Sequence, residues 1–262
     1  MLRVLFFIIP FLAGLDASAS QSGASEMAGL DLNRANSLQM QLCSLKPGKK
    51  MKDYEDSFDD YIAWSKAEDV ETYSLRLTPM FVTQPANSPG FDWIELLVTS
   101  FENSGAAWDK WLKTDEGAKL NANWQSIADC RVSVNPVVTM HYENALAMSK
   151  DNTRIITMNW CSRLPGVTYD QLEEKHQSML ANRVPGSPIS GWSIVYNGLG
   201  MRNAPGEYMH MLSFADNAAL QAYLNNYSNG EGWRNRVAYE TSYATCSGQN
   251  VYFAKVLNRP AN

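Results

Sequence analysis

Apolar residues recur along the chain with two different periods, and these periods predict an alternation of strands and helices. Runs in which every second residue is apolar predict strands, whereas apolar residues at i, i+3 and i+7 predict helices. The first part of the chain is predicted to contain a strand, a helix, two strands, a helical region and a strand, over 37–43, 50–66, 72–78, 92–100, 105–127 and 132–141. The second part has the same predicted order, over 154–161, 169–182, 189–196, 207–213, 217–225 and 248–257.

The two parts also share a short motif that contains a cysteine. Residues 43–48 and 161–166 both have the pattern C-S-x-x-P-G, and both follow a predicted strand. Cys130 follows the first motif cysteine by 87 residues, and Cys246 follows the second by 85. The matching motifs and spacings predict an internal duplication.

The N-terminus predicts export. Arg3, the apolar run 4–15 and the small residues Ala17 and Ala19 have the pattern of a cleavable signal peptide. The run is shorter than the roughly 20 residues that span a membrane. We therefore expect a periplasmic or secreted protein without membrane attachment after cleavage. The predicted organisation is a signal peptide at 1–19, a flexible leader at 20–36, one unit at 37–142, a linker at 143–152 and a second unit at 153–258.

Each unit has the order β-α-β-β-α-β of a ferredoxin-like arrangement. Two such units in one chain resemble the dimeric α+β barrel superfamily, with a fused pseudo-dimer in place of two chains. The resemblance covers residues 37–258 and implies an α+β fold in which two tandem ferredoxin-like repeats pack as an α+β barrel. The superfamily includes cofactor-free monooxygenases, muconolactone-isomerase-like enzymes, EthD and NIPSNAP-like proteins, and haem proteins related to chlorite dismutase. The resemblance rests on topology and duplication, not on a family signature.

The topology implied by the resemblance predicts how the cysteines pair. In the sheet order 4-1-3-2 the end of the first strand lies beside the start of the fourth. Cys43 and Cys161 end the first strands, and Cys130 and Cys246 come just before the fourth strands. Of the three possible connectivities, this order favours Cys43–Cys130 and Cys161–Cys246. An oxidising compartment would preserve such bonds, and the absence of a C-x-x-C motif argues against a metal or redox site.

Alternation divides the residues of each predicted strand between two faces. One face is apolar, as in Ile94, Leu96 and Val98, and the other is mixed, as in Trp93 and Glu95. We expect the apolar faces to lie under the helices. The mixed faces should then point into the barrel interior, where the two sheets meet.

The mixed faces carry the candidate ligand-binding residues. Aligning Trp93 with Tyr208 places Glu95 at the position of His210. Because a buried unpaired charge is costly, one interpretation is that Glu95 pairs with Arg76 on the neighbouring strand and only joins the sheets. The other interpretation is a polar pocket lined by Trp93, Glu95, Tyr208 and His210, with His210 as a base or ligand-binding group.

His176 is the second candidate catalytic residue. It shares a helical face with Leu172, and its counterpart in the first unit is Phe58. It could line a pocket between helix and sheet, or it could be a partly buried structural histidine. A neutral imidazole can act as a base near pH 7 because its ordinary pKa is about 6.5, so we expect any chemistry in the second unit. An inward-pointing His210 would lie across the sheet from His176, and the two could not share one site.

Composition and net charge limit which binding partners are expected. The net charge is −5 with no basic patch, which argues against nucleic acid. Three histidines do not provide a histidine-rich metal site, and hydrolase, zinc-protease and nucleotide-binding motifs are absent from the sequence. We therefore predict no metal and no cofactor; haem, with His176 or His210 as proximal ligand, is a lesser enzyme alternative.

The aromatic residues give the leading functional hypothesis. They make up 11% of the chain and include eight tryptophans, some of which could line a cavity for a small apolar or aromatic ligand. The alternatives are a cofactor-free monooxygenase or isomerase of the α+β barrel type, and a structural or interaction module without pocket chemistry. We expect a monomer or a weak homo-oligomer.

Overall fold

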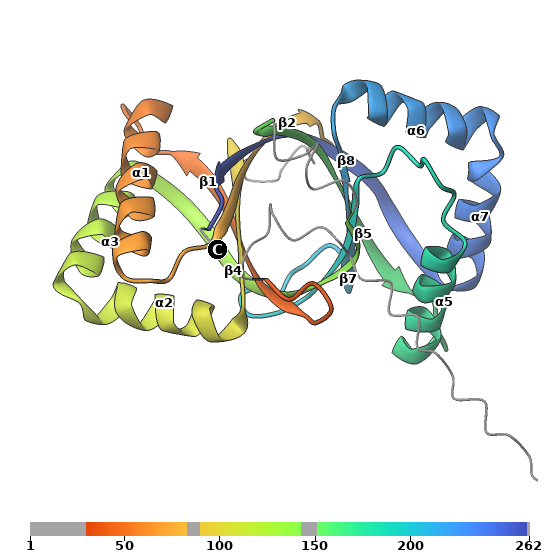
Figure 1. The fold of residues 1–262 in the computed structure, drawn as a ribbon, viewed down its shortest axis with the longest axis horizontal. Coiled ribbons are helices and arrows are strands. Elements are labelled where there is room, and N and C mark those ends of the chain that lie inside the picture. Colours follow the sequence, from red (N-terminus) through yellow and green to blue (C-terminus); the bar gives the residue numbers. More distant parts are fainter. Residues whose placement is uncertain (1–29, 83–89, 143–150, 261–262) are drawn as a thin grey trace, which may run out of the picture.

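A closed barrel of eight antiparallel strands forms the centre of the protein, and helices cover it on two opposite sides (Figure 1). The computed structural model describes residues 30–82, 90–142 and 151–260, and this part of the chain contains six helices. None of these helices has the length and apolar character needed to cross a membrane. The predicted signal peptide, most of the leader and most of the linker lie outside the described residues.

The same succession of elements occurs in two stretches, here called the first half and the second half. The first half contains β1 (Asn36–Leu45), α1 (Met51–Ala67), β2 (Tyr73–Phe81), β3 (Trp93–Thr99), α2 (Phe101–Lys113), α3 (Asp115–Ile127) and β4 (Ala128–Tyr142). The second half contains β5 (Thr153–Arg163), α5 (Tyr169–Ala181), β6 (Gly191–Tyr196), β7 (Tyr208–Phe214), α6 (Asn217–Asn229), α7 (Gly232–Ser242) and β8 (Ala244–Asn258).

The strands of each half lie in the order expected from the resemblance. The order is β4-β1-β3-β2 in the first half and β8-β5-β7-β6 in the second. β2 pairs with β8 and β4 pairs with β6, and these two seams close the barrel. β4 and β8 both begin before the predicted ranges, because their first residues, from Ala128 and Ala244, pair with the ends of β1 and β5.

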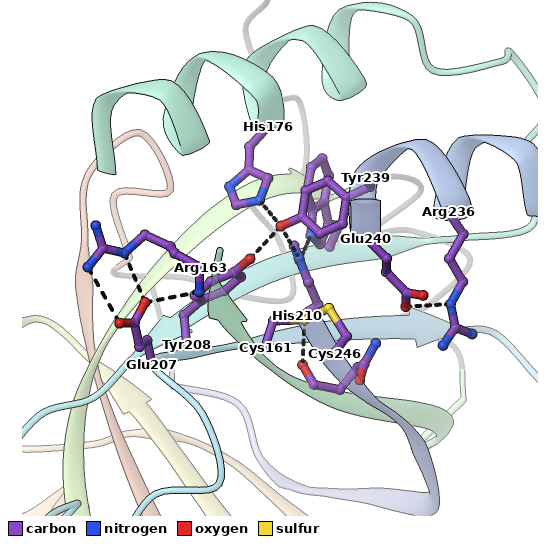
Figure 2. The surroundings of a disulfide bond; sticks show 12 residues. Cys161, Arg163, His176, Glu207, Tyr208, His210, Arg236, Tyr239, Glu240 and Cys246 are labelled. Atoms are coloured by element: carbon purple, nitrogen blue, oxygen red, sulfur yellow. Dashed lines mark hydrogen bonds and ion pairs between the residues drawn. A yellow bond between two sulfur atoms is a disulfide. The ribbon is translucent and has the colours of Figure 1, made fainter. Parts of the chain in front are cut away.

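Two disulfides join the first and last strands of each half, with the predicted pairing. Cys43 and Cys130 are register partners of β1 and β4, and their Cα atoms are 4.1 Å apart. Cys161 and Cys246 occupy the corresponding places in β5 and β8, also with Cα atoms 4.1 Å apart (Figure 2). All four cysteines are bonded.

The two faces of the strands are used in the opposite way to the prediction. All eight strands contribute apolar residues to one cluster that fills the barrel, including Leu38, Leu96, Met158 and Met209. The mixed faces lie under the helices instead. The physical reason is that closing the sheet encloses one face of every strand, where apolar side chains are favoured, whereas the helices can supply hydrogen-bond partners to the mixed faces.

Candidate functional site

The polar faces of β3 and β7 meet the helices at two interfaces, one in each half. In the second half, Thr168 caps α5 and forms a capping box with Gln171, which fixes where the helix begins. This start places Leu172 and His176, one turn apart, against the sheet, and both are buried. The helix therefore presents an imidazole to the strands beneath it.

The strands and α7 supply the remaining members of a buried group. Alternation in β7 points Tyr208 and His210 to the same side of the sheet. Trp192 comes from the neighbouring strand β6, and Tyr239 comes from α7, a helix that the sequence pattern did not reveal. We call these residues the histidine–tyrosine cluster: His176, Trp192, Tyr208, His210 and Tyr239.

Three polar groups of this cluster converge on the hydroxyl of Tyr239 (Figure 2). The Oη atom of Tyr239 lies 2.9 Å from His176 Nε2, 3.2 Å from His210 Nε2 and 2.5 Å from Tyr208 Oη. The imidazole rings of His176 and His210 are 5.1 Å apart between centroids. The expectation that these histidines lie on opposite sides of the sheet is therefore wrong, because His210 faces the helix and not the barrel interior.

Trp192 determines which nitrogen of His210 carries the proton. The indole Nε1–H of Trp192 donates to His210 Nδ1 at 3.1 Å. Since an indole nitrogen is only a donor, His210 Nδ1 must be unprotonated. A neutral His210 then carries its proton on Nε2 and donates it to Tyr239.

The remaining protons follow from counting hydrogen-bond capacity. A phenol has one donor and two acceptor positions. If Tyr239 accepts from His210 and Tyr208, its own proton goes to His176 Nε2. His176 Nδ1, which has no hydrogen-bond partner among the described residues, is then the one unpaired group. The reverse arrangement would leave two groups unpaired, the hydroxyl proton of Tyr208 and the same nitrogen, and is less favourable.

Burial keeps the cluster uncharged at neutral pH. It lowers the pKa of His176 to about 4, with a smaller contribution from Lys175. It lowers the pKa of His210 to about 3, and the neighbouring His176 adds to this effect. Burial also raises the pKa of Tyr208 to about 12 and that of Tyr239 further. Both imidazoles are therefore neutral at pH 7, and His176 Nε2 can accept a hydrogen bond from Tyr239. Only His210 is partly exposed, since the other members are buried.

An ion pair occupies the corresponding place in the first half. Arg76 Nε donates to Glu95 Oε1 at 2.6 Å, and Arg76 also contacts Glu55 at 3.2 Å. The rings of Tyr54 and Phe58 of α1 lie against the guanidinium, with their centroids 5.1 and 5.9 Å from Arg76 Cζ. Burial raises the pKa of the Glu95 carboxyl to about 7 although Arg76 opposes the shift. The structure thus has the sheet-joining pair Glu95–Arg76 that one interpretation of the sequence described.

The predicted ligand-binding residues do not form one pocket. The side chains from the first half, Trp93, Glu95 and Arg76, lie beneath α1. There Trp93 packs edge-on against Tyr54, with ring centroids 4.5 Å apart. Tyr208 and His210 lie beneath α5 and α7, on the other side of the barrel (Figure 1). The proposed polar pocket of Trp93, Glu95, Tyr208 and His210 is therefore wrong, because equivalent positions of the two halves face different helical layers.

A cavity opens elsewhere in the first half, between the sheet and α1, α2 and α3. It has a volume of about 70 Å³. Four of its walls are tryptophans, and we call it the tryptophan pocket: Gln39, Tyr61, Trp64, Thr72, Leu97, Thr99, Ser104, Ala107, Trp108, Trp111 and Trp124. A groove of about 460 Å³ adjoins it and shares Trp108, Trp111 and Trp124 as walls. The sequence showed the tryptophans on these helices but could not show that they surround a space.

Comparison with known proteins finds similarity in fold only. No protein-family model matches the chain, and no curated protein matches it in sequence. A proposed monooxygenase from Fusobacterium nucleatum subsp. nucleatum has a TM-score of 0.53 at 11% identity, over 86% of this chain and 94% of that chain. An anthrone oxidase-like protein has a TM-score of 0.50 at 10% identity, over 87% of this chain and 93% of that chain.

At such low identities this similarity concerns the fold and not the chemistry. It is consistent with the α+β barrel architecture expected from the sequence, which the closed eight-stranded barrel also shows. No particular family of α+β barrel proteins is shown.

Proposed function

We propose that this protein binds a small, flat, largely apolar molecule in the tryptophan pocket of its first half. The observation that carries the proposal is a cavity walled by four tryptophans, beside a larger open groove. Indole rings offer extensive apolar surface and favourable stacking geometry for an aromatic ring. The inner cavity of about 70 Å³ is smaller than the roughly 150 Å³ cavity that holds benzene in an engineered protein. A bound molecule would therefore extend from the cavity into the groove.

The test compares substitutions inside and outside the pocket. Trp108 and Trp111 are only half-buried, so alanine at either position should leave the fold intact. Each variant should weaken binding of an aromatic ligand roughly three- to tenfold, the range expected for a lost aromatic contact. Trp233→Ala is the matched control, because Trp233 is exposed on α7 in the second half. The ligand would first be identified by mass spectrometry of molecules retained by the mature protein. Equal affinities of all three variants and the wild type would contradict the proposal.

The second candidate function is an α+β barrel enzyme, a cofactor-free monooxygenase or isomerase. Two observations favour it: the similarity in fold to a proposed monooxygenase and to an anthrone oxidase-like protein, and the neutral imidazoles of the histidine–tyrosine cluster. In this proposal the Trp192 indole N–H moves off His210 Nδ1, and that nitrogen of His210, the partly exposed member, takes a proton from an acidic C–H or O–H group of the substrate. Tyr239 and His176 would then redistribute protons behind it.

Anthrone is a suitable first probe for this candidate. Its oxidation consumes one O₂ per anthrone and yields anthraquinone and water, so oxygen uptake measures turnover directly. We expect His210→Ala and His176→Ala to lose activity and Glu95→Ala to retain it in folded protein. Loss in the Glu95 variant alone would move the site to the first half, and no turnover by any form of the protein would leave ligand binding as the proposed function.

We also propose how the chain is organised into units. Two ferredoxin-like units at 37–142 and 153–258, joined by a linker at 143–152, would form a fused pseudo-dimer. Matching element order, matching strand order and one disulfide at the same place in each half support this arrangement. The two disulfides also support export to an oxidising compartment, the periplasm or the exterior, after removal of residues 1–19. We propose a monomer or weak homo-oligomer whose partner is a small molecule and not nucleic acid.

A further inference from the structure

Hydroxyl groups in the lining of the tryptophan pocket are already engaged within the protein. Ser104 Oγ accepts from Ser37 at 3.1 Å, and Thr99 Oγ1 accepts from Asn103 Nδ2 at 2.7 Å. Because these groups have partners without a ligand, they contribute little to its selection. No charged residue lines the cavity, so selection depends on the other polar groups of the lining.

Gln39 offers hydrogen-bonding capacity that the protein itself does not use. No hydrogen bond joins its side-chain amide to any of the described residues, and Gln39 is only half-buried. The polar atoms that are both unpaired and sealed from solvent belong to other residues, so Oε1 and Nε2 of Gln39 are both accessible. An amide oxygen accepts and an amide nitrogen donates. A molecule in contact with this side chain can therefore form hydrogen bonds of both kinds.

The accessible amide faces the tryptophan pocket. Leu38 and Met40, its neighbours along β1, belong to the cluster that fills the barrel, so alternation turns Gln39 to the side covered by helices. On that side the next residues of β1, Ser37 and Gln41, are buried. The strand pairs with β3 along one edge and with β4 along the other, which closes it laterally. Because Gln39 lines the cavity, the open space that its amide meets is the cavity itself.

A ligand that fills the cavity must replace the solvent around this amide. The cavity volume of about 70 Å³ exceeds the roughly 10–15 Å³ that one water molecule requires, so water can satisfy the amide when no ligand is bound. A purely apolar ligand would displace this water and leave a donor and an acceptor unpaired, which costs affinity. A ligand with a matching donor and acceptor avoids that cost.

We propose that the tryptophan pocket selects a planar aromatic molecule with a cyclic amide (lactam) group, which pairs with the Gln39 amide through two hydrogen bonds. The lactam N–H would donate to Gln39 Oε1, and the lactam oxygen would accept from Gln39 Nε2. The indole walls would stack against the rings. This inference rests on the proposed binding function and adds the chemical class of the ligand.

Two bicyclic probes of the same shape isolate the lactam N–H. 2-Quinolone is a lactam, and coumarin has the same rings and carbonyl with a ring oxygen in place of the N–H. Coumarin would leave Gln39 Oε1 facing another acceptor, so 2-quinolone should bind roughly five- to a hundredfold more tightly, the range for a buried group left unpaired. 1-Isoquinolone, with the lactam at another ring position, tests the direction of the amide. Naphthalene has neither group and should bind more weakly than 2-quinolone.

The variant Gln39→Met removes the amide and keeps a side chain of similar length. In this variant 2-quinolone should lose its preference over coumarin, whereas Gln221→Met, at an exposed glutamine of α6 in the second half, should keep it. Affinities would come from titrations followed in ¹⁵N–¹H NMR spectra of the mature protein. In the wild type, 2-quinolone should also shift the side-chain NH₂ signal that is missing from the Gln39→Met spectrum. The comparison of 2-quinolone with coumarin in the wild type stands even if Gln39→Met does not fold.

The outcomes separate this inference from the binding proposal. If none of the four probes shifts the indole N–H signals of Trp108, Trp111 or Trp124, the binding proposal itself fails. If these signals shift but neither lactam binds the wild type more tightly than coumarin does, only the lactam pairing is overturned. A preference for the lactam that survives in Gln39→Met would overturn the role of Gln39.

Discussion

Replacing Arg76 with methionine would leave Glu95 buried without its cation, while a methionine side chain could still pack against Tyr54 and Phe58. In the wild type, burial raises the pKa of Glu95 from 4.5 to about 7 despite the bond to Arg76. Between these two pH values the folded protein keeps a proton that the unfolded chain has lost. The stability that Glu95 contributes is therefore complete below pH 4.5, falls as the pH rises toward 7, and levels off above 7.

In Arg76→Met the loss of stability with rising pH should continue to higher pH. Without Arg76 the pKa of Glu95 rises further, so the free energy of unfolding should keep falling above pH 7 by about 1.4 kcal/mol per pH unit. The total loss should approach the roughly 3–5 kcal/mol typical of a broken buried ion pair. In Arg76→Met/Glu95→Gln the carboxyl is absent, so the extra dependence on pH should disappear.

The assay is urea unfolding of the disulfide-intact mature protein from about pH 6 to about pH 8.5, for the wild type, the single variant and the double variant. The histidines titrate alike in all three proteins, so differences between the curves isolate Glu95. Parallel curves for Arg76→Met and the wild type would refute the reasoning, as would a double variant with the same dependence on pH as the single variant.

Three further predictions concern the second half and the disulfides. Folding lowers the pKa of His176 from 6.5 to about 4, so its contribution to stability is complete above pH 6.5 and falls by about 1.4 kcal/mol per pH unit below it. In His176→Phe the free energy of unfolding should therefore fall less steeply below pH 6.5, and an unchanged slope would contradict this. Tyr239→Phe removes the shared partner of the buried His176 and Tyr208 and of the partly exposed His210, and should destabilise the protein by about 2–4 kcal/mol in urea unfolding. Tyr243→Phe changes a partly exposed neighbour and should cost less than about 1 kcal/mol. Equal losses in the two variants would contradict the role of the Tyr239 hydroxyl. Peptide mapping without reductant should recover Cys43 linked to Cys130, and a bond from Cys43 to any other cysteine would contradict the strand order. Replacing both cysteines by alanine should lower the free energy of unfolding by up to about 4 kcal/mol, because an 87-residue loop is released.

Local patterns in the chain were sufficient to predict the order of most strands and helices, whereas the pairing of the cysteines was predicted from the strand order that the resemblance implies. Period-two and period-3.6 patterns reflect the geometry of a single element, and the C-S-x-x-P-G motifs mark the same place in each half. The helix Gly232–Ser242 escaped prediction because it has no clear apolar stripe. Tyr239, the centre of the histidine–tyrosine cluster, escaped with it.

The tertiary structure decided which face of each strand became the interior and which side chains met. Alternation separates two faces but does not show which one faces the barrel, and the closure of eight strands into a barrel made the apolar face the enclosed one. That choice turned His210 toward α5, so that His176 and His210 share one hydroxyl, and it separated Glu95 from Tyr208. The tryptophan pocket likewise depends on how α1, α2 and α3 pack on the sheet. Contacts between residues distant in sequence follow from packing and closure, which no periodicity within one element records.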